Sequence, residues 1–430
     1  MCGVAGIYAY DDRASPIERK ELHRINDYMA ARGPDGQGAW YSTNGRVALG
    51  HRRLSIIDLS ERGAQPMSTA DGRLTISFNG EIYNYRCLQQ QLEAKGFVFE
   101  SDSDTEVLLH LYADRGTEMF GDLRGMFAFV LWDACAKRLL LARDPYGIKP
   151  LYYADNGRTV RIASQVKALL AGGGVSRQPE PAGFAGLLLF GSVPEPYTIW
   201  LAIRSVPAGS FLWADDKGAG APQCYFSIAQ VFRAAVVQQP TPLNPRDLQE
   251  SVRAGVLDSV RHHLVADVPV GAFLSAGVDS GSLVGLMRDA GQQDVQTVTL
   301  KFAEFRGQPR DESGLAEQLA RCYGTRHTTR VVTEQEFKQD LPRILDAMDQ
   351  PSIDGINTWF VSKAAREIPG LKVAISGLGG DELLGGYPSF RDIPRWVRTL
   401  HIPSRVPLLS AAWRRFASLA NVWWPKLSPK

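Results

Sequence analysis

The chain has 430 residues, 44% of them hydrophobic and 22% charged, and its formal net charge at pH 7 is +2. These values are typical of globular proteins, and the length suggests two or three domains. Because the net charge is small, we expect no nucleic-acid partner. The five cysteines are scattered, and neither a signal sequence nor a membrane-spanning apolar run is recognisable. We therefore expect a reduced, cytoplasmic protein.

The first part of the chain, residues 1–180, is dense in short β-like runs separated by turns, and two segments have apolar residues at helical spacing. This mixture predicts an α+β layered domain. Residues 181–245 are rich in Pro and Gly and are interpreted as closing hairpins followed by a linker. The strands expected in the first domain cover 47–50, 74–78, 126–132 and 138–142, and its helices cover 17–30 and 104–115.

From about residue 246 the pattern alternates between helical and strand segments, which predicts an α/β fold with a parallel sheet covered by helices on both faces. The expected strands are 268–274, 295–302 and 372–376, and the expected helices are 248–265, 283–290, 312–323, 337–347 and 359–366. We place the domain boundaries at 1–185, 186–245 and 246–430.

The chain opens with Met1 and Cys2. If Met1 is removed, Cys2 carries both a thiol and a free α-amine, and an amine with a pKa near ~8 can act as the base that a thiol nucleophile needs. The alternative is a Cys that merely follows the start codon. The clusters of polar residues that follow favour the first interpretation.

A thiol that attacks an amide generates an oxyanion, which needs fixed hydrogen-bond donors. The Asn79 side chain and the Gly80 N–H group are candidates. Asp104 could hold an α-ammonium group and Arg53 an α-carboxylate, and together they would select an amino acid such as glutamine. Each of these residues could equally belong to a turn or a surface ion pair, so spacing alone leaves both interpretations open.

Two Gly-rich segments of the second domain each follow a predicted strand. Residues 275–281 open a helix, whose first N–H groups can bind phosphate, and they fit a pyrophosphate-binding loop better than a Walker A loop. The alternative is a plain strand–turn–helix connection. Residues 376–387 supply Asp381. Both segments would lie at the carboxyl ends of parallel strands, where Asp279 and Asp381 could share Mg²⁺ with pyrophosphate.

The tail, residues 393–430, is rich in Arg, Lys and Trp and contains no Asp or Glu. A basic segment with Trp can lie on a membrane interface. The simpler interpretation, which we prefer, is a helical segment packed against the second domain.

Motifs spread from Met1 to about Phe390 resemble, in order, those of the glutamine-dependent asparagine synthetase family. The resemblance implies an N-terminal nucleophile glutaminase domain with αββα layers, a doubly wound ATP pyrophosphatase domain, and an ammonia tunnel between their sites. The matching motifs are MCGVAGI, RGPDG, HRRLSIIDLS, GAQPM, FNGEIYN, SDTEV, GMFAFVLWD, RDPYGIKPLYY, DVPVGAFLSAGVDS and SGLGGDELLGGY.

The resemblance also implies a reaction. ATP, with Mg²⁺, would activate an acceptor carboxylate (aspartate or a related acid) as an acyl-adenylate, and ammonia released from glutamine would attack it to give an amide, AMP and pyrophosphate. In the glutaminase half Cys2 would be the nucleophile, Asn79 and Gly80 the oxyanion hole, and Arg53, Glu81 and Asp104 the glutamine site. In the ATP half Ser275, Gly277, Asp279 and Ser280 would hold pyrophosphate, Asp279 and Asp381 the Mg²⁺, and Leu300, Ser376 and Gly377 the nucleotide.

Three features depart from the family pattern. Leu378 stands where asparagine-forming members usually carry Glu, and leucine can accept neither a proton nor a hydrogen bond. Ala276 and Gly281 replace a usual Gly and a common Ser in the pyrophosphate loop. The chain is also shorter than expected after the Asp381-Glu382 pair.

These departures leave several functions open. The acceptor could be an acid other than aspartate, the chain could be a nucleotide-binding regulatory or scaffold protein, or it could be a glutaminase without ATP chemistry. The sequence does not determine the oligomeric state, and a homodimer is one possibility.

Overall fold

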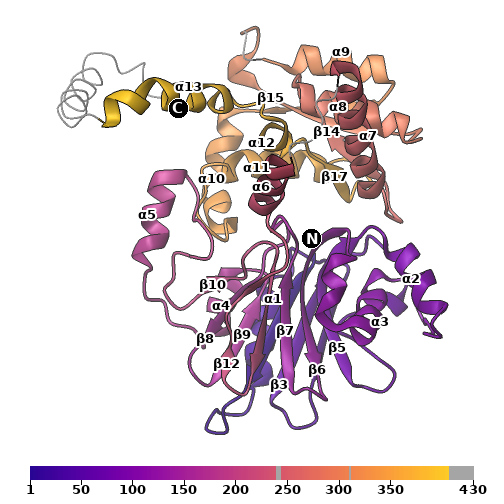
Figure 1. The fold of residues 1–430 in the computed structure, drawn as a ribbon, viewed down its shortest axis with the longest axis vertical. Coiled ribbons are helices and arrows are strands. Elements are labelled where there is room, and N and C mark those ends of the chain that lie inside the picture. Colours follow the sequence, from indigo (N-terminus) through magenta and orange to yellow (C-terminus); the bar gives the residue numbers. More distant parts are fainter. Residues whose placement is uncertain (239–243, 309–310, 406–430) are drawn as a thin grey trace.

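The alternating apolar residues of the first domain form two antiparallel sheets that face each other (Figure 1). The computed structural model describes residues 1–238, 244–308 and 311–405. In the first sheet the strand order is β10-β8-β9-β1-β3-β2, and in the second it is β12-β11-β7-β6-β5-β4 with β13 paired to β11. The first sheet contains β1 (Gly3–Ala9), β2 (Gly36–Tyr41), β3 (Val47–Arg53), β8 (Tyr152–Asp155), β9 (Thr159–Ala163) and β10 (Arg204–Ser205). The second contains β4 (Met67–Ser68), β5 (Leu74–Ile82), β6 (Gly125–Asp133), β7 (Arg138–Arg143), β11 (Ser210–Asp215), β12 (Gly218–Ala219) and β13 (Gln223–Cys224).

Strand alternation sorts the side chains into three cores. On β6, Phe127 and Phe129 face the helices, whereas Ala128 and Val130 face the other sheet. Helices α2 and α3 cover the second sheet, and α1 and α4 cover the first. This confirms the predicted αββα layers. The helices of this domain are α1 (Arg19–Tyr28), α2 (Tyr85–Glu93), α3 (Asp104–Arg115), α4 (Val166–Gly172) and α5 (Pro181–Phe190).

One strand breaks the apolar pattern between the sheets. The inner face of β5 carries Thr75, Ser77, Asn79 and Glu81, all buried. Buried polar groups need partners or a function, because their desolvation is costly. This row runs toward Cys2, at the end of the sandwich that faces the second domain, where the N-terminus lies (Figure 1).

The second domain contains a four-stranded parallel sheet of order β16-β15-β14-β17. Helices α7, α8 and α9 pack in one core, and α10 and α11 in another. This arrangement confirms the predicted doubly wound fold. The strand order reverses between β14 and β17, so the loops after these two strands border the switch point, where such folds bind ligands. The elements are α7 (Pro245–His263), β14 (Val270–Phe273), α8 (Val278–Asp289), β15 (Gln296–Phe302), α9 (Ser313–Tyr323), β16 (Arg326–Val332), α10 (Glu334–Ala347), α11 (Gly355–Arg366), β17 (Val373–Ile375), α12 (Gly380–Leu384) and α13 (Pro388–Arg405).

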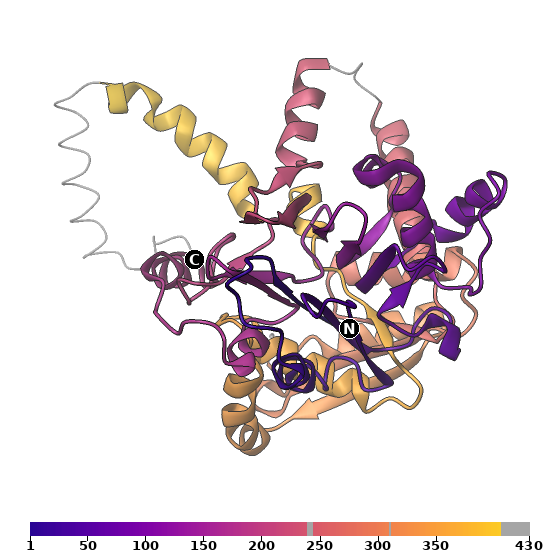
Figure 2. The ribbon, with the colours of Figure 1, turned by 90° about the horizontal axis from the view of Figure 1, so that it is seen from below.

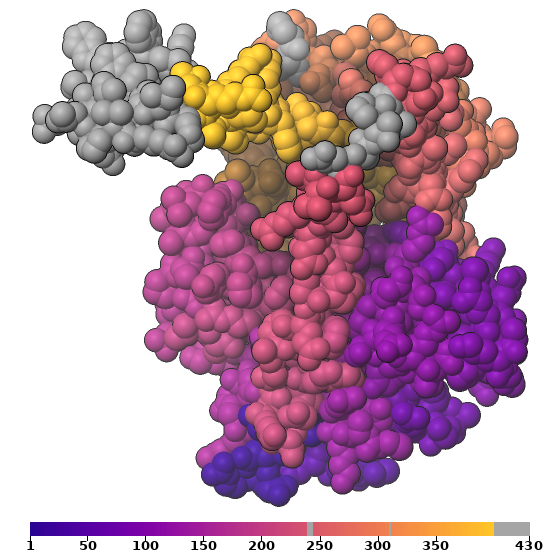
Figure 3. Space-filling model, in the orientation of Figure 1, coloured from indigo at the N-terminus to yellow at the C-terminus, as the bar shows by residue number. Residues whose placement is uncertain are grey.

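The segment between the domains differs from the expected hairpins and linker. The hairpin strands β10 to β13 extend the two sheets of the first domain, but the boundary placed at residue 185 falls inside α5. A further helix, α6 (Ile228–Gln238), precedes α7. The space-filling view shows this stretch running up the front of the first domain toward the second (Figure 3). The exact domain boundaries remain a prediction.

The tail is helical up to Arg405, as expected, but α13 projects from the second domain instead of packing against it (Figures 1 and 2). The side chains of Phe390, Ile393, Trp396 and Val397 in this helix are more than half exposed. Trp413, Trp423 and Trp424 lie outside the described residues. Within the described ranges, no helix is both long and apolar enough to span a bilayer.

Candidate active site

Cys2 precedes β1, the strand that lies between β9 and β3 in the first sheet. Its thiol Sγ accepts a hydrogen bond from the Leu54 N–H at 3.3 Å and donates to the Leu54 carbonyl at 3.6 Å. Burial raises the pKa of the Cys2 thiol, whereas the positive charges of Lys149 and Arg32 act in the opposite direction. Burial also lowers the pKa of the adjacent Met1 α-amine to about 6. The Met1 α-amine is therefore largely unprotonated near neutral pH.

Arg32 holds the backbone at Cys2 in place. Its Nε donates to the Cys2 carbonyl at 2.9 Å, while its Nη2 is buried and has no hydrogen-bond partner among the described residues. Burial lowers the pKa of Arg32. The next residue, Gly33, lies so close to the Arg52 backbone that a Cβ atom there would collide with it. The RGPD segment therefore needs its glycine for close approach to β3.

The oxyanion-hole candidates lie on β5. Asn79 is 1% exposed, and its Nδ2 group has no hydrogen-bond partner in the described part of the chain. A buried donor without a partner is costly in a resting protein, and a substrate oxygen would satisfy it. At Gly80 an added Cβ would collide with the Met126 carbonyl and the Phe78 ring, so only glycine fits there.

Two carboxylates lie beside these donors. Glu81 is 3% exposed and Asp104, the first residue of α3, is 4% exposed. Burial raises the pKa of Asp104 to about 7, and the negative charge of Glu81 adds to the effect. Asp104 Oδ2 accepts a hydrogen bond from the Ile82 N–H at 2.9 Å, which holds the side chain in place. A buried pair of this kind is prepared to bind a cation such as an α-ammonium group.

Arg53, at the end of β3, is half-buried and held by backbone carbonyls. Its Nη1 donates to the Ser60 carbonyl at 2.8 Å and its Nη2 donates to the Asp58 carbonyl. These bonds orient the guanidinium group and leave other N–H groups of the fork available to a carboxylate. The role of Arg53 in binding a carboxylate stays a prediction.

Lys149 lies in the RDPYGIKPLYY motif, and its residue type alone predicts no role. It is 5% exposed, and its charge acts on both Cys2 and Glu81. Its loop is held by Asp144, which is fully buried and accepts hydrogen bonds from the N–H groups of Tyr146, Ile148 and Lys149. The loop therefore holds one cation beside the thiol. No spacing signal in the sequence links Lys149 to Cys2.

The loop after β14 is closed by hydrogen bonds among its own residues. Ser280 Oγ lies 2.9 Å from Ser275 Oγ and accepts from the Ser275 N–H at 3.0 Å, and the Gly277 N–H donates to Ser275 Oγ at 3.1 Å. Gly277 caps α8 without a side chain. The first N–H groups of this helix are consequently available to an anion.

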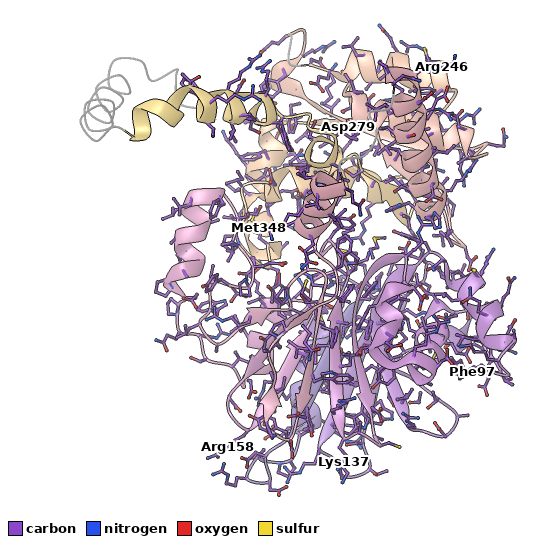
Figure 4. The ribbon with its side chains drawn as sticks, viewed as in Figure 1. Phe97, Lys137, Arg158, Arg246, Asp279 and Met348 are labelled. Atoms are coloured by element: carbon purple, nitrogen blue, oxygen red, sulfur yellow. The ribbon has the colours of Figure 1, made fainter. Side chains whose placement is uncertain are left out.

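The loop after β17 meets the first loop at Asp279 (Figure 4). A Cβ atom at Gly377 would lie 3.2 Å from the Asp279 Cβ, and one at Gly380 would lie 2.5 Å from Asp279 Oδ2. The hydrogen bond to Glu382 is the main cause of the raised pKa of Tyr387, and the charges of Asp381 and Asp279 add to it, so both carboxylates lie on the same side of this domain. The predicted convergence of the two loops is therefore seen.

The remaining predicted residues of this domain have clear positions. Leu300 lies on β15 and packs half-buried against the core around Phe360, and Ser376 directly follows β17. Leu378 is 89% exposed, and its side chain offers no polar atom at the loop surface. Ala276 is not among the described residues with positive φ, so its methyl group causes no backbone strain.

Comparisons with known proteins match both halves of the chain. A family model described as "Glutamine amidotransferase domain" matches residues 1–226, and one described as "Asparagine synthase" matches residues 251–429. Asparagine synthetase [glutamine-hydrolyzing] 1 of Bacillus subtilis is 36% identical over 91% of this chain and 60% of its own length. Asparagine synthetase [glutamine-hydrolyzing] 3 of the same organism is 30% identical over all of this chain and 69% of its own length. Asparagine synthetase B [glutamine-hydrolyzing] of Escherichia coli is 30% identical over 93% of this chain and 67% of its own length. The chain spans about three fifths of the length of the first relatives it matches.

Proposed function

Because the chain belongs to the glutamine-hydrolysing asparagine synthetase family, we propose that it transfers ammonia from glutamine to a carboxylate that ATP has activated. The observation that carries the proposal is the buried cluster at the end of the first domain. There the charges of Arg32 and Lys149 act on the Cys2 thiol and that of Glu81 acts on the adjacent Met1 amine, on the side of the sandwich that faces the second domain (Figure 1). The doubly wound switch point supplies a separate anion site for ATP.

In the first domain Cys2 attacks the side-chain amide of glutamine. The unpartnered Nδ2 group of Asn79 and the Gly80 N–H stabilise the oxyanion that forms. Arg53 binds the α-carboxylate, and Asp104 with Glu81 binds the α-ammonium group. The tetrahedral intermediate then collapses to a thioester as its C–N bond breaks and ammonia leaves. Water hydrolyses the thioester, which releases glutamate and restores the Cys2 thiol.

In the second domain the residues around α8 bind ATP. Ser275, Gly277 and Ser280 hold the pyrophosphate, whereas Leu300, Ser376 and Gly377 border the nucleotide. Mg²⁺ fits this chemistry because it takes one or two carboxylates together with phosphate oxygens and water. Asp279 and Asp381 would hold it, because the loop that carries Asp381 packs directly against Asp279. When bound, Mg²⁺ neutralises charge on the phosphates.

The acceptor is aspartate or another small acid. The exposed Leu378 favours an acid other than aspartate, because this apolar side chain cannot hydrogen-bond a second carboxylate. A cytoplasmic location and a homodimer are compatible with this function.

The proposal is tested by two measurements on the same protein: glutamate release from glutamine, and acceptor-dependent pyrophosphate release from ATP across a panel of carboxylic acids. We expect Asp279→Asn to abolish pyrophosphate release while glutamate release continues. Nucleotide binding without pyrophosphate release by the unsubstituted chain, for every acid, would favour a regulatory protein instead.

A further inference from the structure

One of the contacts between the domains is made by a short segment after α10 in the second domain. The Asp349 carboxylate accepts a hydrogen bond from the Val166 N–H at 2.8 Å through Oδ2, and one from the Lys167 N–H at 2.9 Å through Oδ1. Val166 and Lys167 open α4 in the first domain, whereas Asp349 follows α10 in the second. The neighbouring Met348 lies where the two domains meet (Figure 4).

Other bonds of the same segment hold it in register. The Lys167 ammonium group donates to the Asp346 carbonyl at 2.6 Å, and Gln350 Oε1 accepts from the Ile199 N–H at 3.1 Å. The Ile353 N–H donates to the Gly191 carbonyl at 2.9 Å. Residues 346–353 of the second domain therefore bind the first domain through several backbone groups at once.

From α4 a continuous line of contacts leads to the nucleophile. Helix α4 packs on α1 in one buried core that contains Val166, Leu169, Ile25 and Met29. Met29 lies directly against Gly3, since a Cβ atom at Gly3 would be 3.0 Å from the Met29 Cβ. Because packed interiors transmit displacements, a shift of α4 must shift the start of β1.

A second, electrostatic line runs beside the packed one. Arg32 follows α1, its N–H donates to the Met29 carbonyl at 2.9 Å, and its Nε holds the Cys2 carbonyl. The Asp349 charge acts on Arg32 and opposes the effect of burial on its pKa. The Asp349 carboxylate of the second domain is thus connected to Cys2 in two ways. One runs through the packing of α4 and α1, and the other through the guanidinium group of Arg32.

We propose that Asp349 is a positioning residue for the glutaminase reaction: it is the group through which the second domain holds Cys2 in its reactive position. The inference rests on the proposed function. It makes the reactivity of the thiol depend on a residue that touches neither glutamine nor ATP. Arg53, Asp104 and Glu81 are not part of this line, so binding of the amino acid should be independent of Asp349.

The test uses the full chain and a diazoketone analogue of glutamine, which alkylates an activated thiol. The rate of Cys2 alkylation is followed by mass spectrometry of the N-terminal peptide at increasing analogue concentration. For Asp349→Ala we expect the maximal rate to fall about tenfold, because the thiol is misplaced, with an unchanged half-saturating concentration. Asp349→Asn, which keeps one acceptor oxygen, should lie between this variant and the unsubstituted chain.

Asp258→Ala is the matched control, since it removes another carboxylate contact between the domains, the 2.6 Å ion pair with Arg124. It should leave both alkylation parameters unchanged. Equal maximal rates for Asp349→Ala, Asp349→Asn and the unsubstituted chain would overturn the inference, as would a rise in the half-saturating concentration that accounts for the whole effect. If Asp349→Ala does not fold, Asp349→Asn decides. Absence of Cys2 alkylation in the unsubstituted chain would instead refute the proposed glutaminase.

Discussion

His51 Nδ1 lies 3.1 Å from Ser77 Oγ, between the two sheets of the first domain. Ser77 uses its hydroxyl hydrogen to donate to the Gly50 carbonyl at 2.8 Å, so its oxygen can only accept from His51. His51 is therefore the neutral tautomer with the proton on Nδ1, and its buried Nε2 carries a lone pair. Burial lowers the pKa of His51 from 6.5 to about 3. His51 is thus a neutral, buried residue that packs against Ser77.

This state predicts how stability depends on pH. Between pH 6.5 and about 3 the unfolded chain binds a proton at His51 and the folded chain does not, so His51 destabilises the fold as the pH falls through this range. We compare unfolding free energies of the unsubstituted chain and His51→Gln, which cannot titrate. The difference between the two unfolding free energies should be constant above pH 6.5. Below pH 6.5 the unsubstituted chain should lose stability relative to His51→Gln. A difference independent of pH would contradict the neutral assignment.

Asp104 predicts the opposite pH dependence of stability, and it also predicts a pH dependence of glutamine hydrolysis. Its folded pKa, raised to about 7, lies above its ordinary value of 3.8, so its contribution to stability is complete below pH 3.8 and is lost as the pH rises through about 7. Binding of an α-ammonium group requires the ionised form. We therefore expect kcat/KM for glutamine hydrolysis to rise with pH and level off above an inflection near 7. In Asp104→Asn this inflection should disappear together with most of the affinity for glutamine; an unchanged profile would exclude Asp104 from the site.

The contact between the two ATP loops predicts which glycine tolerates a side chain. A methyl group at Gly380 would meet Asp279 Oδ2 at 2.5 Å, whereas one at Gly281 would lie in ordinary contact with Leu319, at 3.5 Å. Gly380→Ala should displace the Asp279 carboxylate and lower acceptor-dependent pyrophosphate release about tenfold or more, because small misplacements of such groups are costly. Gly281→Ser is the matched control and should retain the rate. Similar rates for both variants would show that Asp279 does not act where the loops meet.

Leu378 offers a test of acceptor choice. Because its side chain is 89% exposed, Leu378→Glu should fold like the unsubstituted chain. We expect the added carboxylate to raise aspartate-dependent pyrophosphate release relative to that with the preferred acid. The ratio of the two rates is the measurement. An unchanged ratio would mean that position 378 does not contribute to acceptor selection.

Much of this fold could be predicted because its signals are local. The strands of the two sheets carry strict alternation, as in β6, where Phe127 and Ala128 face different cores. β16 was not predicted because its segment, RHTTRVV, lies at the sheet edge and is largely polar. α5 was read as linker because its Gly residues hide an otherwise apolar helix. Its Gly183 is needed for close contact, since a Cβ there would collide with the Thr198 carbonyl.

The residues of the candidate site also divide into those that local sequence signals predict and those that they do not. Cys2, Asn79 and Asp104 stand in motifs whose residue types already suggest their chemistry. Lys149 and Asp349 could not be predicted, because their importance depends on long-range packing that brings distant segments to Cys2. His51 was visible in a polar cluster, but its tautomer follows only from the hydroxyl that it contacts.

The central claim is that Cys2 releases the ammonia that the second domain uses. The most direct test is Cys2→Ala, assayed for acceptor-dependent pyrophosphate release with glutamine and, separately, with added ammonia. Our account predicts that the glutamine-dependent rate is lost while the ammonia-dependent rate is kept. A glutamine-dependent rate that survives the substitution would contradict it.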